Sequence, residues 1–159
     1  MQIRIICVGK IKESFYRDAV AEYQKRLSRY VKIQVVECAD EKTPEDASPA
    51  EKTRIINREG ERILSKIRER DHVIALAIKG KSLTSEEFSE MIGRCMLDGT
   101  GTIDFIIGGS LGLSEAVLRR ADLSLSFSAF TFPHQLMRVI LAEQIYRAFR
   151  ILCGEPYHK

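Results

Sequence analysis

The fold is decided near the C-terminus, by the stretch Leu125-Ser-Phe-Ser-Ala-Phe-Thr-Phe-Pro133-His-Gln-Leu-Met-Arg-Val-Ile-Leu-Ala-Glu-Gln-Ile-Tyr-Arg147-Ala-Phe-Arg150. It begins as a short apolar strand, passes through a loop of small and aromatic residues, and enters a long amphipathic helix with Pro133 in its first turn. The chain then ends on Gly154-Glu-Pro-Tyr-His-Lys159. A terminus that only packs or frays rarely carries a Tyr-His pair, so this ending indicates a binding or reactive role.

The same alternation of short strands and helical patterns runs through the rest of the chain. Because each strand is separated from the next by a helix, we expect an α/β fold with a mostly parallel sheet covered on both faces. Val73–Ile78 is apolar throughout and is predicted to be a central strand. Val31–Cys38 alternates apolar and polar residues, as a strand exposed on one face would. The predicted strands are Ile3–Val8, Val31–Cys38 (the alternating run), Val73–Ile78 (the apolar run), Ile103–Ile107 and Leu123–Phe127.

The helices between these strands are predicted from capping residues and apolar spacing. Ser14 is expected to cap the first helix, and Thr84 to open a capping box with Glu87. Residues 39–49 are polar, contain two prolines and are predicted to form a mobile loop. The final helix is apolar over more than one side, which indicates a helix wedged in the core or shared with another subunit. The residues expected to face inward are Phe15, Ala19, Tyr23 and Leu27; Ile56, Gly60, Ile63 and Ile67; and Phe88, Ile92 and Cys95.

Length and composition limit the class of protein. The 159 residues, 45% hydrophobic and 30% charged, suit one domain spanning residues 1–159 with its own core. No apolar run approaches the roughly 20 residues that cross a bilayer, and we expect neither a signal peptide nor a membrane location. The four cysteines form no CxxC pair, which favours reduced core thiols, no metal site and a cytoplasmic protein. The net charge of +3 permits nucleic-acid binding without demanding it.

One motif raises an alternative function. Gly108-Gly-Ser-Leu-Gly112 matches G-x-S-x-G between a strand and a helix, the context of a hydrolase nucleophile elbow. Asp122 and His134 follow Ser110 in the order that a serine hydrolase needs. Against this, the chain is short for that fold and lacks an HGGG-like segment. The other interpretation is that the glycines allow the backbone to approach a ligand.

Two further features indicate a ligand site. The segment Phe127–Phe132 interleaves aromatic and small residues, which suits either a core-facing loop or a pocket for a flat ring read by backbone groups. Ligands of parallel sheets lie beyond the carboxyl ends of the strands, where this segment and Gly108 are both expected. Tyr157 and His158 are the sharpest candidates for a reactive role, since Pro156 stiffens the approach to them and a histidine titrates near neutrality.

Several of these features together resemble one family. They are Gly108-Gly-Ser-Leu-Gly-Leu after a strand, Leu125 to Gln135, Arg138-Val, Glu143 with Tyr146-Arg-Ala, and Pro156-Tyr-His-Lys. With Ile6-Cys-Val-Gly-Lys and Tyr23-Gln-Lys-Arg, the chain is similar over its whole length to the RlmH-type SPOUT methyltransferases, least specifically over residues 40–70. That family methylates N(3) of a pseudouridine in large-subunit (23S) ribosomal RNA.

The resemblance implies more than the pattern can show. It implies a Rossmann-like sheet with a C-terminal trefoil knot, and a homodimer in which the tail of one subunit meets the cofactor loops of the other. Carried over by position, S-adenosyl-L-methionine is expected against Leu76, Gly108, Phe127, Ser128, Ala129, Phe130, Thr131 and Phe132. The residues expected to act on the substrate are Arg147, Tyr157 and His158.

The implied reaction is an in-line transfer of a methyl group from a sulfonium to a nitrogen that must lose its proton. Arg147 can stabilise negative charge on a base carbonyl or grip a phosphate. Tyr157 can stack on the base, and His158 can accept the proton. With no added RNA-binding domain, recognition is expected to depend on the assembled ribosome. The competing hypotheses are a serine hydrolase built on Ser110 and a non-catalytic nucleotide-binding dimer.

Overall fold

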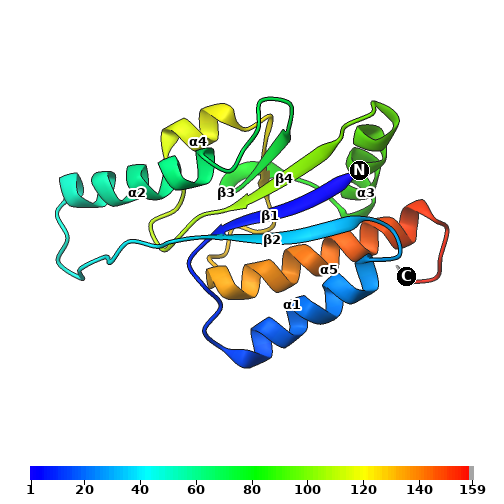
Figure 1. The fold of residues 1–159 in the computed structure, drawn as a ribbon, viewed down its shortest axis with the longest axis horizontal. Coiled ribbons are helices and arrows are strands. Elements are labelled where there is room, and N and C mark those ends of the chain that lie inside the picture. Colours follow the sequence, from blue (N-terminus) through cyan, green and yellow to red (C-terminus); the bar gives the residue numbers. More distant parts are fainter. Residues whose placement is uncertain (158–159) are drawn as a thin grey trace.

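The computed structural model describes residues 1–157, and it shows five strands with helices on both sides (Figure 1). All strand pairs are parallel, in the order β2-β1-β4-β3-β5. His158, one of the predicted catalytic residues, lies outside the described part of the chain. The elements are β1 (Gln2–Val8), α1 (Ser14–Leu27), β2 (Lys32–Cys38), α2 (Pro49–Leu64), β3 (His72–Ser82), α3 (Ser85–Leu97), β4 (Thr102–Ile107), α4 (Glu115–Arg120), β5 (Leu123–Ser126) and α5 (His134–Leu152).

The order of the strands follows from the direction of each connection. The chain moves from β1 out to β2 and later from β3 to β4 through α1 and α3, which lie on one face of the sheet. It moves in the opposite direction, from β2 to β3 and from β4 to β5, through α2 and α4 on the other face (Figure 1). When the direction of a connection across the sheet and the face that its helix covers are both reversed, the crossover keeps the same handedness. All four connections therefore share one hand, as expected for parallel strands. The predicted α/β class with a parallel, doubly covered sheet is confirmed.

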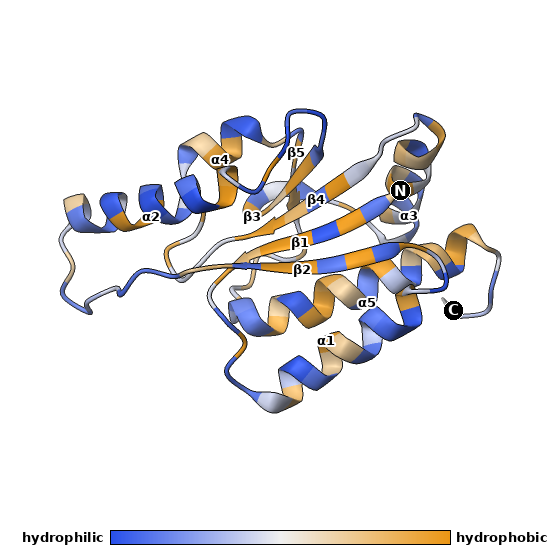
Figure 2. Ribbon diagram, viewed as in Figure 1, coloured by the Kyte–Doolittle hydropathy of each residue, from blue (hydrophilic) through white to orange (hydrophobic). Residues whose placement is uncertain are grey.

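Burial along the strands matches their places in the sheet. β1 and β4 are almost wholly buried in the middle of the sheet. β2 is an edge strand of exposed and half-buried residues that is buried only at Cys38, and its residues alternate in hydropathy (Figure 2). β3 lies between β4 and β5, so the prediction of an interior strand from its apolar sequence is confirmed. The strand Leu123–Phe127 was predicted one residue too long, since β5 ends at Ser126.

Two hydrophobic clusters fill the space on the two sides of the sheet. The larger lies under α1, α3 and α5, and includes Leu27, Phe88 and Leu141. The smaller lies under α2 and α4, around Ile63 and Val117. α5 packs between α1 and α3. This position accounts for the apolar residues on more than one side of α5, and of the two interpretations it supports a helix wedged in the core.

A buried arginine fixes the N-terminal half of α5 to the sheet. Arg138 is 0% exposed, and its Nη2 donates to the carbonyl oxygens of Val8 and Gly9 at 2.9 and 2.8 Å. Its Nη1 pairs with Glu37 at 3.0 Å. Gln135 accepts the N–H of Lys12 at 2.8 Å, which adds a second tie to the loop after β1. The start of α5 is thereby held beyond the carboxyl ends of β1 and β2.

Two expectations for α1 are wrong. Glu13, not Ser14, occupies the N-cap position, and its side chain makes no cap hydrogen bond. Phe15 does not face the core: it is 62% exposed, and the buried residues of α1 are Val20 and Leu27. The other end of the predicted face does meet the core, since Leu27 is fully buried and Tyr23 packs against the core cluster and the ring of Tyr146.

Three further details differ from or confirm the prediction. α2 buries Ile55, not Ile56, because its inner face also carries the buried Glu59. β3 runs on beyond Ile78 to Ser82, with a bulge that lets both Leu76 and Lys81 pair with Leu125. The capping box of Thr84 and Glu87 is confirmed.

Candidate active site

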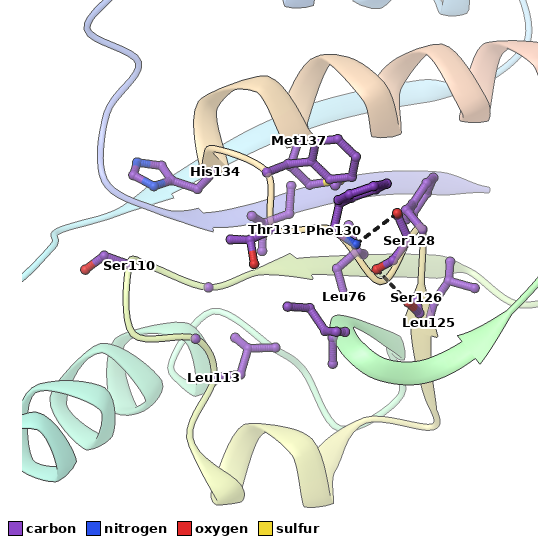
Figure 3. Close-up of a pocket in the computed structure, with 18 of the residues that line it drawn as sticks. Leu76, Ser110, Leu113, Leu125, Ser126, Ser128, Phe130, Thr131, His134 and Met137 are labelled. Carbon is purple, nitrogen blue, oxygen red and sulfur yellow. Dashed lines mark hydrogen bonds between the residues drawn. The ribbon is translucent and has the colours of Figure 1, made fainter. Parts of the chain in front are cut away.

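A pocket of about 380 Å³ lies beyond the carboxyl ends of β3, β4 and β5 (Figure 3). Three segments form its walls: the end of β3, the turn after β4, and the loop between β5 and α5. The first turn of α5 adds a fourth side. The lining residues are Leu76, Ala77, Ile78, Ile107, Gly108, Gly109, Ser110, Leu111, Gly112, Leu113, Leu125, Ser126, Phe127, Ser128, Phe130, Thr131, Phe132, His134 and Met137.

Glycine is required where the chain turns after β4. A Cβ atom on Gly108 would lie 2.7 Å from the carbonyl oxygen of Gly112, and Gly112 itself has a φ of +88° that side chains disfavour. Gly109 and Gly112 pair across the turn. The turn therefore presents bare backbone to the pocket, so a ligand can approach main-chain groups directly.

The loop between β5 and α5 is organised by Ser128. Its hydroxyl accepts the N–H of Phe130 at 3.0 Å, and its carbonyl accepts the hydroxyl of Ser126 at 3.2 Å, as Figure 3 shows. Phe127 points into the core, where its ring meets Phe88 edge-on at 6.2 Å. Phe130 is 78% exposed. The aromatic loop thus serves both interpretations, with one ring in the core and another at the rim of the pocket.

The predicted cofactor residues are brought together by the fold. All of them line this single pocket except Ala129. The prediction did not include Leu113, Met137 or His134 as pocket residues. His134 was considered in the sequence only as a possible triad residue. Met137 follows it by three residues on α5, so the two share one face of the helix, and helical spacing could have indicated that both line the pocket.

His134 lies at the pocket wall in a setting that keeps it neutral. Burial lowers the pKa of its imidazole, and the nearby Arg138 and Lys12 lower it further, while Asp40 opposes them. A neutral imidazole retains one ring nitrogen that accepts a hydrogen bond. The side chain can therefore orient a ligand at the edge of the pocket without adding charge.

A second cluster, which contains two of the predicted catalytic residues, lies toward the C-terminal end of α5. Glu143 Oε1 accepts hydrogen bonds from Arg147 Nη2 at 2.6 Å and from the Tyr157 hydroxyl at 3.2 Å. The Arg147 guanidinium lies 4.8 Å from the centre of the Tyr157 ring, and Tyr146 meets that ring edge-on at 5.0 Å. The tail thus folds back onto α5 of its own chain and places two predicted catalytic residues in contact.

Glu155 holds the tail in this position. Its carboxylate accepts the Tyr30 hydroxyl at 2.6 Å and pairs with Arg29 at 2.7 Å and Arg150 at 2.6 Å. Burial, the charge of Glu143 and contact with Tyr23 together raise the pKa of Tyr157 to about 12. The phenol is therefore protonated at neutral pH and acts as a hydrogen-bond donor.

The two clusters are far apart within one chain. Met137 borders the pocket, and Arg147 follows it ten residues later on the same helix, a separation of about 15 Å along the axis. Arg147 and Tyr157 therefore lie together but not at the pocket of their own chain.

The serine-hydrolase hypothesis is wrong. Ser110 is an exposed residue of the turn after β4 that borders the pocket (Figure 3). Asp122 lies at the start of β5, where it accepts the N–H of Val73 at 2.7 Å and pairs with His72 and Arg120. His72, the partner of Asp122, begins β3, whereas Ser110 follows the end of β4. Because these strands are parallel, Asp122 lies at the amino ends of the strands and Ser110 beyond their carboxyl ends. No triad can form.

Comparison with known proteins agrees with this arrangement. A family model described as "Predicted SPOUT methyltransferase" matches residues 1–158, and the chain belongs to that family. The class is therefore that of the SPOUT methyltransferases, which excludes the non-catalytic nucleotide-binding dimer considered above.

Two relatives match over the full length of both chains. "Ribosomal RNA large subunit methyltransferase H" of Clostridium botulinum (strain Kyoto / Type A2) is 62% identical, and the protein of the same name from Streptococcus agalactiae serotype III (strain NEM316) is 60% identical. Among solved structures, a probable methylase family protein from Haemophilus influenzae Rd KW20 has a TM-score of 0.53 at 14% identity, over 99% of this chain and 70% of that one. The last likeness supports the fold alone.

Other kinds of site are not found within residues 1–157. No group of three or more His, Cys, Asp or Glu side chains there is arranged to hold a metal ion. No described helix is long and apolar enough to cross a membrane.

Proposed function

We propose that this protein transfers a methyl group from S-adenosyl-L-methionine to N(3) of a pseudouridine in large-subunit ribosomal RNA. The main support is the match of about three residues in five, over full length, to proteins named ribosomal RNA large subunit methyltransferase H. The pocket at the ends of β3, β4 and β5 supplies the physical basis, because it combines apolar walls with exposed backbone groups.

The pocket fits the proposed cofactor in size and chemistry. A volume of about 380 Å³ falls in the range of small-molecule sites. Leu76, Leu113 and Met137 offer apolar surface for a flat ring, and the bare backbone at Gly108 offers polar groups to its edge. Because an adenine ring is uncharged, the pocket needs no acidic or basic side chain to bind it. We assign the cofactor to Leu76, Gly108 and the loop Phe127–Phe132, Ala129 included.

When bound, S-adenosylmethionine supplies a methyl group on a positively charged sulfur. The work left to the protein is to orient the base and to stabilise the charge on it once its N(3) proton is lost. We assign the charge-stabilising role to Arg147, which Glu143 holds in place. We assign a positioning role to Tyr157, since its protonated phenol donates a hydrogen bond and its ring can stack on a base. His158 remains our candidate for the proton acceptor.

A homodimer would unite the two clusters. Since Arg147 and Tyr157 lie about 15 Å along α5 from the pocket of their own chain, we propose that they act at the pocket of the partner subunit. We further propose a cytoplasmic location and the assembled ribosome as substrate. The trefoil knot implied by the family stays a prediction.

The proposal is tested by transfer of a radiolabelled methyl group to ribosomes from cells that lack the enzyme. Methylation at N(3) of one pseudouridine in the large subunit is the expected product, and ribosomes already modified serve as the control. The isolated RNA hairpin, assayed beside intact ribosomes across a salt titration, tests recognition of the particle. Equal rates on both substrates would contradict recognition of the assembled ribosome, and no transfer to either would contradict the function.

A further inference from the structure

One buried carboxyl group has no role in the site described above. Glu59 on α2 is 4% exposed, and its Oε1 accepts the N–H of Glu41 at 3.0 Å. Its Oε2 is buried and has no hydrogen-bond partner among the described residues. A buried, unsatisfied oxygen destabilises a fold unless something else requires it.

Glu59 Oε2 faces the turn from Gly108 to Ser114, which lines the proposed cofactor pocket. A Cβ atom on Gly109 would lie 2.7 Å from Glu59 Oε2, 3.3 Å from Glu59 Cδ and 3.2 Å from Val8 Cγ1. The carboxyl group is therefore packed against the main chain of Gly109, and a Cβ atom at this position would force it to move. Gly108 and Gly109 are both pocket residues, so Glu59 contacts the far side of the pocket wall.

The next residue of α2 contacts the other end of the same turn. A Cβ atom on Gly60 would meet Ser114, whose hydroxyl caps α4 by accepting the N–H of Val117 at 3.3 Å. Glu59 and Gly60 thus support the turn at Gly109 and at Ser114, on either side of its exposed tip. The Glu41 contact ties the same carboxyl to the loop after β2.

We propose that Glu59 is a positioning residue for the cofactor pocket, whose carboxyl group sets the path of the turn from Gly108 to Ser114 and thereby the affinity for S-adenosylmethionine. This inference rests on the proposed function for the identity of the ligand. It assigns to α2, which contributes no pocket residue, an effect on binding rather than on methyl transfer.

The surroundings of the Glu59 carboxyl group contain charges of both signs. The charged groups near it are Asp40 and Glu41 from the loop after β2 and Arg62 from α2 itself, and the turn presents the main chain of Gly109 to it. Burial is the main cause that raises the pKa of Glu59, Asp40 adds to it, and the hydrogen bond from Glu41 opposes it. Glutamine has nearly the same shape as glutamate and keeps an oxygen that can accept the N–H of Glu41, so it should preserve the arrangement.

The test compares Glu59→Ala and Glu59→Gln with the exposed neighbour Glu61→Ala as the matched control. Calorimetry on the ligand-free proteins should show S-adenosylmethionine binding about tenfold more weakly to Glu59→Ala, the size of one lost buried contact. Glu59→Gln and Glu61→Ala should bind as the wild type does. At saturating cofactor the kcat of Glu59→Ala should stay close to the wild-type value. Hydrogen exchange at the amides of residues 109–113 should be faster in ligand-free Glu59→Ala alone.

A double-mutant cycle makes the contact itself measurable. Gly109→Ala should weaken cofactor binding because its methyl group meets Glu59, and the same change should do less harm in the Glu59→Ala background. If Glu59→Ala does not fold, Glu59→Asp replaces it, since the shorter side chain withdraws the carboxyl from Gly109.

Unchanged affinity in a folded Glu59→Ala or Glu59→Asp protein would overturn the inference and leave Glu59 as a purely structural residue. That result is distinct from failure of the proposed function, in which the wild-type protein itself would neither bind S-adenosylmethionine nor transfer its methyl group.

Discussion

At the scale of single residues, Glu143 connects the two groups proposed to act on the RNA. One oxygen of its carboxylate accepts hydrogen bonds from both Arg147 and Tyr157. The i, i+4 spacing of Glu143 and Arg147 is common on helix surfaces, where such a pair contributes little. Here both side chains are largely buried and Tyr157 covers them, so the pair holds the guanidinium in one orientation.

Tyr157→Phe removes the hydroxyl and keeps the ring over Arg147. Because the pKa of Tyr157 is about 12, the phenol does not titrate near neutrality. We expect kcat to fall by about tenfold or less, with both limbs of the pH–rate profile unmoved between about pH 6 and 9. Methyl transfer to ribosomes across that range measures this. Loss of one limb would mean that Tyr157 exchanges a proton during the reaction.

The ion pairs of Glu155 should make the stability of the folded protein depend on pH. The hydrogen bond from Tyr30, assisted by Arg150 and Arg29, lowers the pKa of this carboxyl in the folded protein below its usual 4.5. A lowered folded pKa gives stability that is present above the unfolded pKa and is lost as pH falls through the folded one. Glu155→Gln should therefore lower thermal stability at neutral pH and flatten its decline between about pH 5 and 3. A decline as steep as that of the wild type would show that Glu155 is not its source.

At the scale of elements, α5 joins the pocket to the tail, and Arg138 fixes its position. The carbonyls of Val8 and Gly9 and the carboxylate of Glu37 all accept hydrogen bonds from the Arg138 guanidinium, so the position of the helix depends on this one side chain. The first turn of α5 carries His134 and Met137 into the pocket wall. Displacement of α5 would therefore change the pocket and the tail together.

Arg138→Ala should destabilise the protein by about 3 kcal/mol, because it removes a buried charge that satisfies two carbonyls and a carboxylate. For a chain of this length we expect the melting temperature to fall by about 10 °C. Differential scanning calorimetry measures both, with the exposed Arg119→Ala as control. Equal melting temperatures for the two variants would contradict the anchoring role.

At the scale of the whole molecule, the pocket and the tail are parts of one site only if two chains associate. Co-expression of differently tagged chains allows a direct test. One chain ends at Gly154 and so lacks the tail, and the other carries Gly108→Ala, whose methyl group would meet the carbonyl of Gly112. Each homodimer should be inactive.

The purified heterodimer should recover about half of the wild-type rate, because one of its two sites is then complete. Sedimentation of both homodimers confirms that the changes leave assembly intact. An inactive heterodimer, or a truncated homodimer with the full rate, would show that the tail does not act on the partner's pocket.

The sequence by itself determined the layered α/β fold and indicated several of the segments that line the pocket. Alternation of apolar strands with capped helices can be satisfied by a parallel sheet, and the carboxyl ends of its strands necessarily lie at one edge, where Leu76, Gly108 and the Phe127–Phe132 loop are. Local signals such as the Thr84 capping box are read from neighbouring residues, which is why they were predicted correctly.

Only the tertiary structure decided which side of each helix is buried and which polar groups meet. Phe15 and Ile56 were placed wrongly because helical spacing alone leaves the rotation of a helix free, and the packing of α1 on α5 and of Glu59 on the glycine turn sets it. Ser110, Asp122 and His134 follow one another in the Ser, Asp, His order of a hydrolase triad, yet strand direction separates the acid from the serine. Arg138 and Glu59 make their contacts with residues distant along the chain, and such contacts exist only after the chain has folded.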